Sequence, residues 1–162
     1  KFLILYMKIH WLKLAVSIII CQLAGIIGSM FTAPNIPSWY ATLVKPVFNP
    51  PNWIFAPVWI SLYVLMAISF YLVWIKNDIP NFGFLMSLFV LQLVLNAFWT
   101  IIFFGLKSPF FAFIEIVVLW ILILLCVISF YKISKTASVL LIPYLLWVTF
   151  AAVLNFELWR LN

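Results

Sequence analysis

The chain has 162 residues, of which 69% are hydrophobic, 20% aromatic and only 7% charged. A soluble domain is about 45–50% apolar and about 25% charged, so this composition excludes a water-soluble globular protein. The net charge of +6 does not indicate a nucleic-acid-binding protein, because the nine basic residues are spread between apolar runs and form no cluster. The composition predicts an all-α membrane protein, with residues 1–162 forming one domain surrounded by lipid.

Five apolar segments, separated by charges and prolines, each approach the roughly 20 residues that a helix needs to cross a bilayer. They lie at about residues 12–32, 55–75, 82–104, 109–131 and 137–159. The connections after the second, third and fourth segments are short, which predicts antiparallel neighbours and a compact up-and-down bundle of five transmembrane helices. Only the connection between the first two, residues 33–54, is long, and long loops in compact domains are often functional.

The first segment contains small residues at positions that allow close helix packing, either within one subunit or between two. They are Ala24, Gly25, Gly28 and Ser29. Cys21 and Cys126 lie alone in apolar segments and are interpreted as small hydrophobic residues. His10, the only histidine, has no partners at ligand spacing, so no metal site is predicted.

The long connection runs into the second segment as WYATLVKPVFNPPNWIFAPVW, residues 39–59. Its prolines remove hydrogen-bond donors and fix φ, so the stretch is predicted to be stiff and not to form one continuous helix. Its tryptophans and tyrosine are typical of membrane interfaces, and also of surfaces that stack on flat ligands. The loop is therefore either a cap at the membrane surface or the wall of a binding site.

Three of the later segments each place aromatic or amide residues on one helical face, because positions three and four apart align. These residues are Trp59, Tyr63 and Met66; Gln92, Asn96 and Trp99, extended by Phe103; and Trp147, Ala151 and Asn155. The amides either hydrogen-bond between helices and hold the bundle together, or line one pocket with tryptophan walls. Such a pocket suits a large, flat, mostly apolar ligand better than an ion or a sugar.

Only three residues are acidic, so few side chains could act as a general acid or base. Asp78 is predicted to be a solvated residue in a turn. Glu115 lies inside the fourth segment, where it either reaches toward Lys107, is protonated, or serves a ligand or proton path. Glu157 and Arg160 are three residues apart and are predicted to form an ion pair.

The distribution of basic residues suggests an orientation in the membrane. One side of the predicted bundle carries Lys1, Lys8, Lys13, Lys76, Lys132 and Lys135, and the other carries Lys45, Lys107 and Arg160. Because cytoplasmic loops are richer in lysine and arginine, this favours a cytoplasmic N-terminus with the long loop outside.

Four motifs in order closely resemble the TspO/MBR family of tryptophan-rich sensory proteins and translocator, or peripheral benzodiazepine receptor, proteins. They are WYATLVKP, NPPNWIFAPVW followed by SLYVLM, QLVLNAFW, and LLIPYLLWVTFAAVLNFELWRLN. The resemblance covers the chain from about Trp39 onward. It implies a five-helix membrane bundle, usually a homodimer, with a ligand pocket near the first loop and no obligatory cofactor. The ligands of the family include protoporphyrin IX, haem, sterols in animal members and synthetic drugs.

Carried over by motif, the resemblance implies ligand contacts in the loop and in three helices. The implied residues are Tyr40, Pro50, Trp59, Asn96, Trp99, Trp147, Ala151, Asn155 and Phe156. Phe156 replaces a tyrosine of the animal sterol motif, which favours a bacterial tetrapyrrole-binding member over a sterol-binding one. Phe48 replaces a tryptophan that is common after the KP pair, so one aromatic contact of the loop is altered.

The leading hypothesis is a porphyrin-binding sensor, regulator or translocator in a bacterial membrane, inner or outer, rather than in the mitochondrial outer membrane. One alternative is light-dependent degradation of porphyrin, in which Trp59 and Trp147 would act as redox partners; no conventional catalytic set is present. Another is transport of porphyrins or sterol-like lipids, which the sequence supports less because it shows no inverted repeat and no intramembrane charge network.

Overall fold

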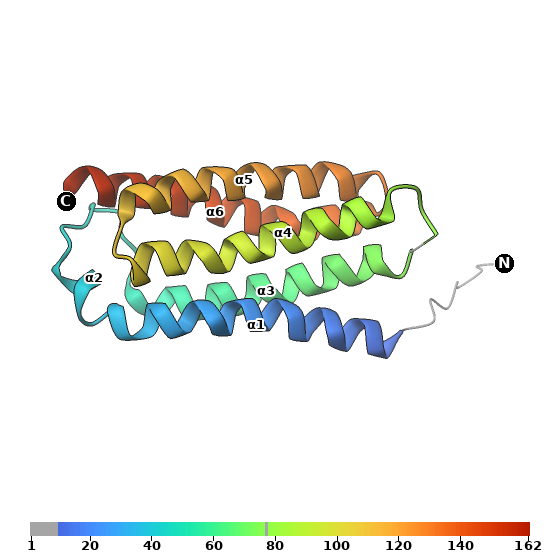
Figure 1. The fold of residues 1–162 in the computed structure, drawn as a ribbon, viewed down its shortest axis with the longest axis horizontal. Coiled ribbons are helices and arrows are strands. Elements are labelled where there is room, and N and C mark those ends of the chain that lie inside the picture. Colours follow the sequence, from blue (N-terminus) through green and yellow to red (C-terminus); the bar gives the residue numbers. More distant parts are fainter. Residues whose placement is uncertain (1–9, 77) are drawn as a thin grey trace.

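The computed structural model describes residues 10–76 and 78–162, and this part of the chain consists mostly of helices joined by loops (Figure 1). Five helices are long and apolar enough to cross a membrane. They are α1 (Trp11–Asn35), α3 (Asn52–Trp74), α4 (Phe82–Thr100) with its continuation η1 (Ile101–Gly105), α5 (Pro109–Tyr131) and α6 (Lys135–Leu161). The predicted all-α bundle of five membrane-spanning helices is therefore confirmed. Lys1 and Lys8, used for the orientation, lie outside the described residues.

Local sequence accounts for several of the helix ends. α5 begins with Pro109 at its first position, where a missing N–H costs nothing. α6 begins after Ser134, whose hydroxyl accepts a hydrogen bond from the N–H of Ala137 at 3.3 Å. The third span ends in a wide π-helical turn, η1, which places Phe103 and Phe104 side by side with their rings 4.9 Å apart.

The proline-rich stretch is more helical than predicted. A single turn, α2 (Trp39–Thr42), forms within the loop, and α3 begins at Asn52, directly after Pro51. Pro57 lies inside α3. It is close to the start of the helix, so it removes only one backbone hydrogen bond there. The stretch is still not one continuous helix, because residues 43–51 separate α2 from α3.

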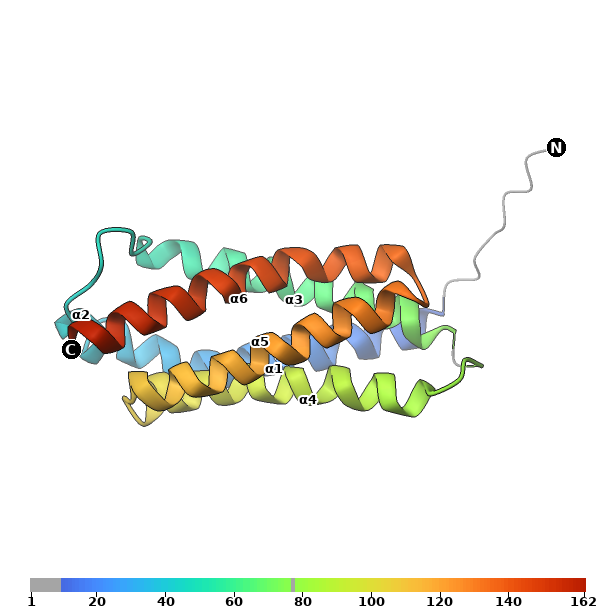
Figure 2. The ribbon, with the colours of Figure 1, turned by 90° about the horizontal axis from the view of Figure 1, so that it is seen from above.

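The five long helices form a ring in the order α1, α3, α6, α5, α4, with α1 also packing against α4. Figure 2 shows α3 and α6 together on one side of the bundle and α4 on the other. The short connection between α3 and α4 does not make them close neighbours, contrary to the expectation from its length. α1 packs against both of them, and their side chains meet across the centre, where Phe70 stacks on Phe89 with the ring centres 4.5 Å apart.

The small residues of α1 are used inside the subunit. A Cβ atom added at Gly25 would lie 2.5 Å from Cε2 of Tyr63 on α3, and one at Gly28 would lie 2.9 Å from Oγ1 of Thr100 on α4. Both distances are too short for a real contact, so glycine is what lets α1 approach α3 and α4 this closely. Of the two interpretations of these residues, the structure supports packing within one subunit.

The half of the bundle away from α2 is filled with side chains. Phe89 stacks between Phe70 and Phe130, and all three rings are buried. Two buried serines tie the helices there: Ser69 donates to the carbonyl of Ala137, and Ser138 donates to that of Val127, each at 2.7 Å. The described residues leave a large cavity in the half next to α2.

Candidate ligand-binding cavity

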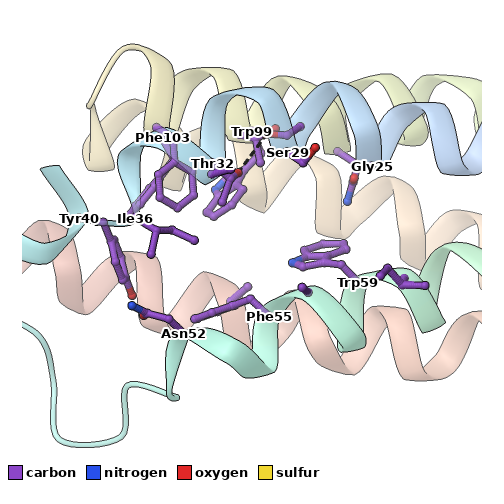
Figure 3. A pocket seen from close by; sticks show the side chains of 18 of the residues that line it. Gly25, Ser29, Thr32, Ile36, Tyr40, Asn52, Phe55, Trp59, Trp99 and Phe103 are labelled. Atoms are coloured by element: carbon purple, nitrogen blue, oxygen red, sulfur yellow. Dashed lines mark hydrogen bonds between the residues drawn. The ribbon is translucent and has the colours of Figure 1, made fainter. Parts of the chain in front are cut away.

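A cavity of about 580 Å³ lies inside the helix ring, beneath α2 and the loop that follows it. Figure 3 shows its walls, with Phe55 and Trp59 projecting from α3 toward Thr32 and Ser29 of α1, and Tyr40 at one end. α4 and η1 contribute Asn96, Trp99, Thr100, Phe103 and Phe104; α6 contributes Trp147, Ala151, Leu154, Asn155 and Leu158. The volume falls within the range of about 300–1,000 Å³ that is usual for small-molecule sites.

Seven of the nine residues predicted to contact ligand line this cavity. They are Tyr40, Trp59, Asn96, Trp99, Trp147, Ala151 and Asn155. The helical faces recognised in three separate segments thus converge on one space. Met66 and Gln92, which share two of these faces, lie farther from α2 in the packed part of the bundle, where both are buried.

The other two predicted residues do not line the cavity. Phe156 follows Asn155 by one position, so its side chain is turned about 100° around α6; it packs against Phe113 of α5 and Trp159, with ring centres 5.3 and 5.7 Å away. Pro50 lies in the loop just before α3 and is half-buried there. The geometry therefore does not support ligand contact at these two positions.

Asn96 is fully engaged with protein partners. Its Oδ1 accepts a hydrogen bond from the hydroxyl of Tyr63, and its Nδ2 donates to the hydroxyl of Tyr144 at 3.0 Å. Trp59 stacks on Tyr63, with ring centres 5.6 Å apart, and meets Tyr144 edge-on at 6.3 Å. Asn96 therefore links α3, α4 and α6 and fixes the two tyrosine rings that support Trp59 at the cavity wall.

Asn155 and Trp99 form a second link. Nε1 of Trp99 donates to Oδ1 of Asn155 at 3.0 Å, and Nδ2 of Asn155 donates to the carbonyl of Pro109 at 2.7 Å. Trp99 also stacks on Phe103, with ring centres 5.0 Å apart. For Asn96 and Asn155 both interpretations hold at once, because the two residues line the cavity and their hydrogen bonds join helices. For Gln92 neither holds: its buried Oε1 and Nε2 have no hydrogen-bond partner among the described residues, and it does not line the cavity.

The loop closes the cavity at the end near α2. Tyr40 is only 4% exposed and donates its hydroxyl to Oδ1 of Asn49 at 2.6 Å. Trp39 packs edge-on against Phe103, with ring centres 5.4 Å apart. Burial raises the pKa of Tyr40 to about 12, although the bond to Asn49 acts in the opposite direction. The phenol therefore stays a neutral hydrogen-bond donor at physiological pH.

The loop is also tied to the end of α6 through Asn162. The N–H of Val44 donates to Oδ1 of Asn162 at 2.9 Å, and Nδ2 of Asn162 donates to the carbonyl of Val44 at 3.0 Å. Phe48 packs edge-on against Phe150 of α6, with ring centres 6.3 Å apart. Of the two interpretations of the loop, the structure supports the wall of a site, because Tyr40 lines the cavity and the loop covers it.

One wall of the cavity was not predicted. α1 contributes a stripe of residues spaced three and four apart: Gln22, Gly25, Ser29, Thr32 and Ile36. The spacing is visible in the sequence. Small and hydroxyl residues in a membrane span are also typical of helix packing, however, and the sequence analysis predicted helix packing alone for this segment. Asn52 and Phe55, at the start of α3, are further lining residues that sequence reasoning missed.

No charged residue lines the cavity in the described part of the chain, and no cluster of potential metal ligands occurs in residues 10–76 and 78–162. Glu115 does not reach Lys107: its carboxylate oxygens are buried and have no hydrogen-bond partner among the described residues, and it does not line the cavity. The predicted pair between Glu157 and Arg160 is confirmed, at 2.6 Å. The site can therefore offer aromatic surfaces and hydrogen bonds, but no ionic partner, to a ligand.

The fold and the site define a five-helix integral membrane protein with a tryptophan-walled cavity under its first loop. The sequence matches the TspO/MBR family over residues 17–160, and the protein belongs to this family. It is 47% identical to the tryptophan-rich protein TspO of Chlorobaculum tepidum, covering 93% of this chain and 96% of that one. It is 44% identical to the protein of the same name from Archaeoglobus fulgidus, covering 93% and 97%. Identity to the human translocator protein is 34%, covering 87% and 85%.

Proposed function

We propose that the protein binds a flat, mostly apolar tetrapyrrole, such as protoporphyrin IX or haem, and acts as a membrane sensor or translocator. The observation that carries the proposal is the cavity of about 580 Å³, walled by Trp59, Trp99 and Trp147 and free of charge in its described lining. Indole rings provide apolar faces on which a flat macrocycle stacks. The names of two relatives, tryptophan-rich sensory protein and translocator protein, support the sensory or translocator part of the proposal.

The test is a titration of the protein in nanodiscs with protoporphyrin IX, followed by quenching of tryptophan fluorescence. Ala151→Phe places a ring inside the cavity and is expected to weaken binding by about tenfold or more, equivalent to about 1.4 kcal/mol. Val153→Phe is the matched control, because Val153 lies on the same helix but on its exposed face. Absence of saturable quenching in the wild-type protein, or equal weakening in both variants, would contradict the proposal.

A second candidate function is photo-oxidative degradation of the bound porphyrin with dioxygen as the oxidant. The observation that favours it is the position of Trp59, which lines the cavity and stacks on Tyr63, so an oxidised indole would have a phenol in contact. Illumination of the complex separates the two functions, because a binding protein leaves the porphyrin absorbance intact. Full turnover in Trp59→Phe would exclude a role for this residue.

The five membrane-spanning helices make this a multi-pass membrane protein. We propose that it lies in a bacterial cell membrane; the identity of 47% to a bacterial relative, against 34% to the human translocator protein, supports this proposal. We also propose a homodimer, as expected from the family resemblance. Chemical cross-linking in native membranes tests this, and recovery of the monomer alone would contradict it.

A further inference from the structure

The cavity is covered on the side of the loop. Tyr40 is buried, Trp39 packs on Phe103, and Asn162 holds the backbone of Val44 through two hydrogen bonds. A ligand arriving through the loop would have to break these contacts. The walls formed by α4 and α6 are closed by the link from Trp99 to Asn155.

The wall between α1 and α3 is built differently. Away from α2 the two helices are joined, since the N–H of His10 donates to the hydroxyl of Tyr71 at 3.1 Å and Gly25 packs directly on the ring of Tyr63. Between Gly25 and α2, residues of α1 and α3 face each other across the cavity, as Ser29 and Phe55 do in Figure 3. The close helix contact therefore ends at Gly25, where the cavity begins.

Several residues between Gly25 and α2 line the cavity and are also exposed on the outside of the bundle. Ile26 of α1 is 56% exposed and Ile60 of α3 is 58% exposed, whereas the inner-wall residues Tyr63 and Asn96 are buried. Ser29, Ala33 and Ala56 are lining residues that are exposed as well. Residues that belong to both surfaces mark an opening, and we call these five residues the side opening.

The rim of the side opening suits hydrocarbon and not water. It contains no charged residue, and the hydroxyl of Ser29 donates to the carbonyl of Ile26 at 2.7 Å, so it presents no unpaired donor to lipid. The neighbouring outer surface of α1 is apolar, with Leu23, Ile27 and Met30 exposed. In the membrane these side chains contact acyl chains.

We infer that the cavity opens sideways into the bilayer between α1 and α3, and that an apolar ligand enters from the membrane while the loop stays closed. This inference rests on the proposed function, because it concerns the route of the same ligand. An apolar, flat molecule concentrates in the hydrocarbon region. A side opening lets it reach the tryptophan walls without crossing the polar loop.

The test measures how fast protoporphyrin IX moves from donor vesicles into the protein in nanodiscs, using the fluorescence of the porphyrin. Ile26→Trp with Ile60→Trp narrows the opening, and we expect association and dissociation to slow together by about tenfold, within the one to three decades seen among mutants of one interface. The affinity changes less, because the altered side chains lie at the rim. Ile27→Trp with Val64→Trp is the matched control, since both residues are exposed on the same helices but do not line the cavity.

Asn162→Ala tests the alternative route, because it removes the two hydrogen bonds that hold the loop at Val44. Entry through the side opening predicts unchanged rates in this variant. The inference is overturned if Asn162→Ala speeds association while the rim variant binds at the wild-type rate.

A second measurement does not depend on porphyrin binding, so it separates this inference from the proposed function. Lipids with brominated acyl chains quench indoles that they can reach. The emission of Trp59, taken as the difference between each protein and the same protein with Trp59→Phe, is expected to be quenched by these lipids. It is expected to be quenched less in Ile26→Phe with Ile60→Phe, which narrows the opening without adding an indole. Absence of saturable porphyrin binding contradicts the proposed function alone, whereas equal quenching in the open and narrowed proteins contradicts the side opening.

Discussion

Among single residues, the buried amides of Asn96 and Asn155 join the helices around the cavity. Asn96 and Asn155 both line the cavity, yet each donates and accepts a hydrogen bond within the protein. In a membrane, such bonds contribute about 0.6 kcal/mol each on average, but losing one also leaves a buried partner unpaired. The amides thus position the aromatic walls, on which the proposed binding of a flat ligand depends.

We expect Asn96→Ala to lower the stability of the folded protein by about 1–3 kcal/mol, because the hydroxyls of Tyr63 and Tyr144 lose their partner in a buried site. Thermal unfolding in detergent measures this loss. Asn52→Ala is the control, since Asn52 also lines the cavity but is exposed. Equal destabilisation of the two variants would show that the amide network has no special role.

The raised pKa of Tyr40 predicts that the stability of the folded protein falls at high pH. Burial raises its pKa to about 12 in the folded protein, whereas a tyrosine in an unfolded chain ionises near pH 10. Its contribution to stability is complete below about pH 10 and is lost as the pH rises toward 12, because only the unfolded chain releases the proton there. Loss of stability between pH 9 and 11.5 should be smaller in Tyr40→Phe than in wild type; equal slopes would contradict this assignment.

At the scale of helices, α1 is held by close backbone approach. Gly25 and Gly28 let α1 pack against Tyr63 and Thr100. The hydroxyl of Thr32 donates a hydrogen bond to the carbonyl of Gly28 at 3.0 Å. α1 therefore contacts α3 and α4 through a narrow stripe, while most of its surface faces lipid. This arrangement leaves room for the cavity at the end of the helix near α2.

We expect Gly25→Ala to destabilise the contact between α1 and α3, because its Cβ would lie 2.5 Å from the ring of Tyr63. Gly83→Ala, at the start of α4, meets nothing within 4 Å and should be neutral or stabilising by about 0.5–1 kcal/mol. Melting temperatures in the same detergent compare the two variants. A Gly25→Ala protein as stable as Gly83→Ala would contradict the close approach.

At the scale of the whole molecule, the bundle has a packed half and a hollow half. Stacked phenylalanines fill the ring of helices away from α2, and the cavity occupies the half beneath the loop. Contacts between distant parts of the chain close it: Asn162 holds Val44, 118 residues away. The packed half keeps the ring together, so the hollow half can accept a ligand without losing the fold.

Asn162→Ala is expected to loosen the loop without changing global stability by more than about 1 kcal/mol, because it removes two exposed hydrogen bonds to Val44 and one to the carbonyl of Leu158 in its own helix. Limited proteolysis measures the effect as faster cleavage between residues 43 and 51. Arg160→Ala is the control, since it breaks only the exposed pair with Glu157, and such pairs contribute little. Equal cleavage of both variants would show that Asn162 does not hold the loop.

The five spans could be predicted from the sequence, because the length and hydropathy of each helix decide whether it crosses the bilayer. The helical faces with Trp59, Asn96 and Trp147 were also predictable, since spacing along one helix is a local property. Tertiary structure decided the rest. The position of α1 between α3 and α4, the pairing of Asn96 with two tyrosines and the side opening at Ile26 and Ile60 all depend on which helices pack together. Packing joins residues far apart in the chain, and no pattern within a single helix specifies its neighbours.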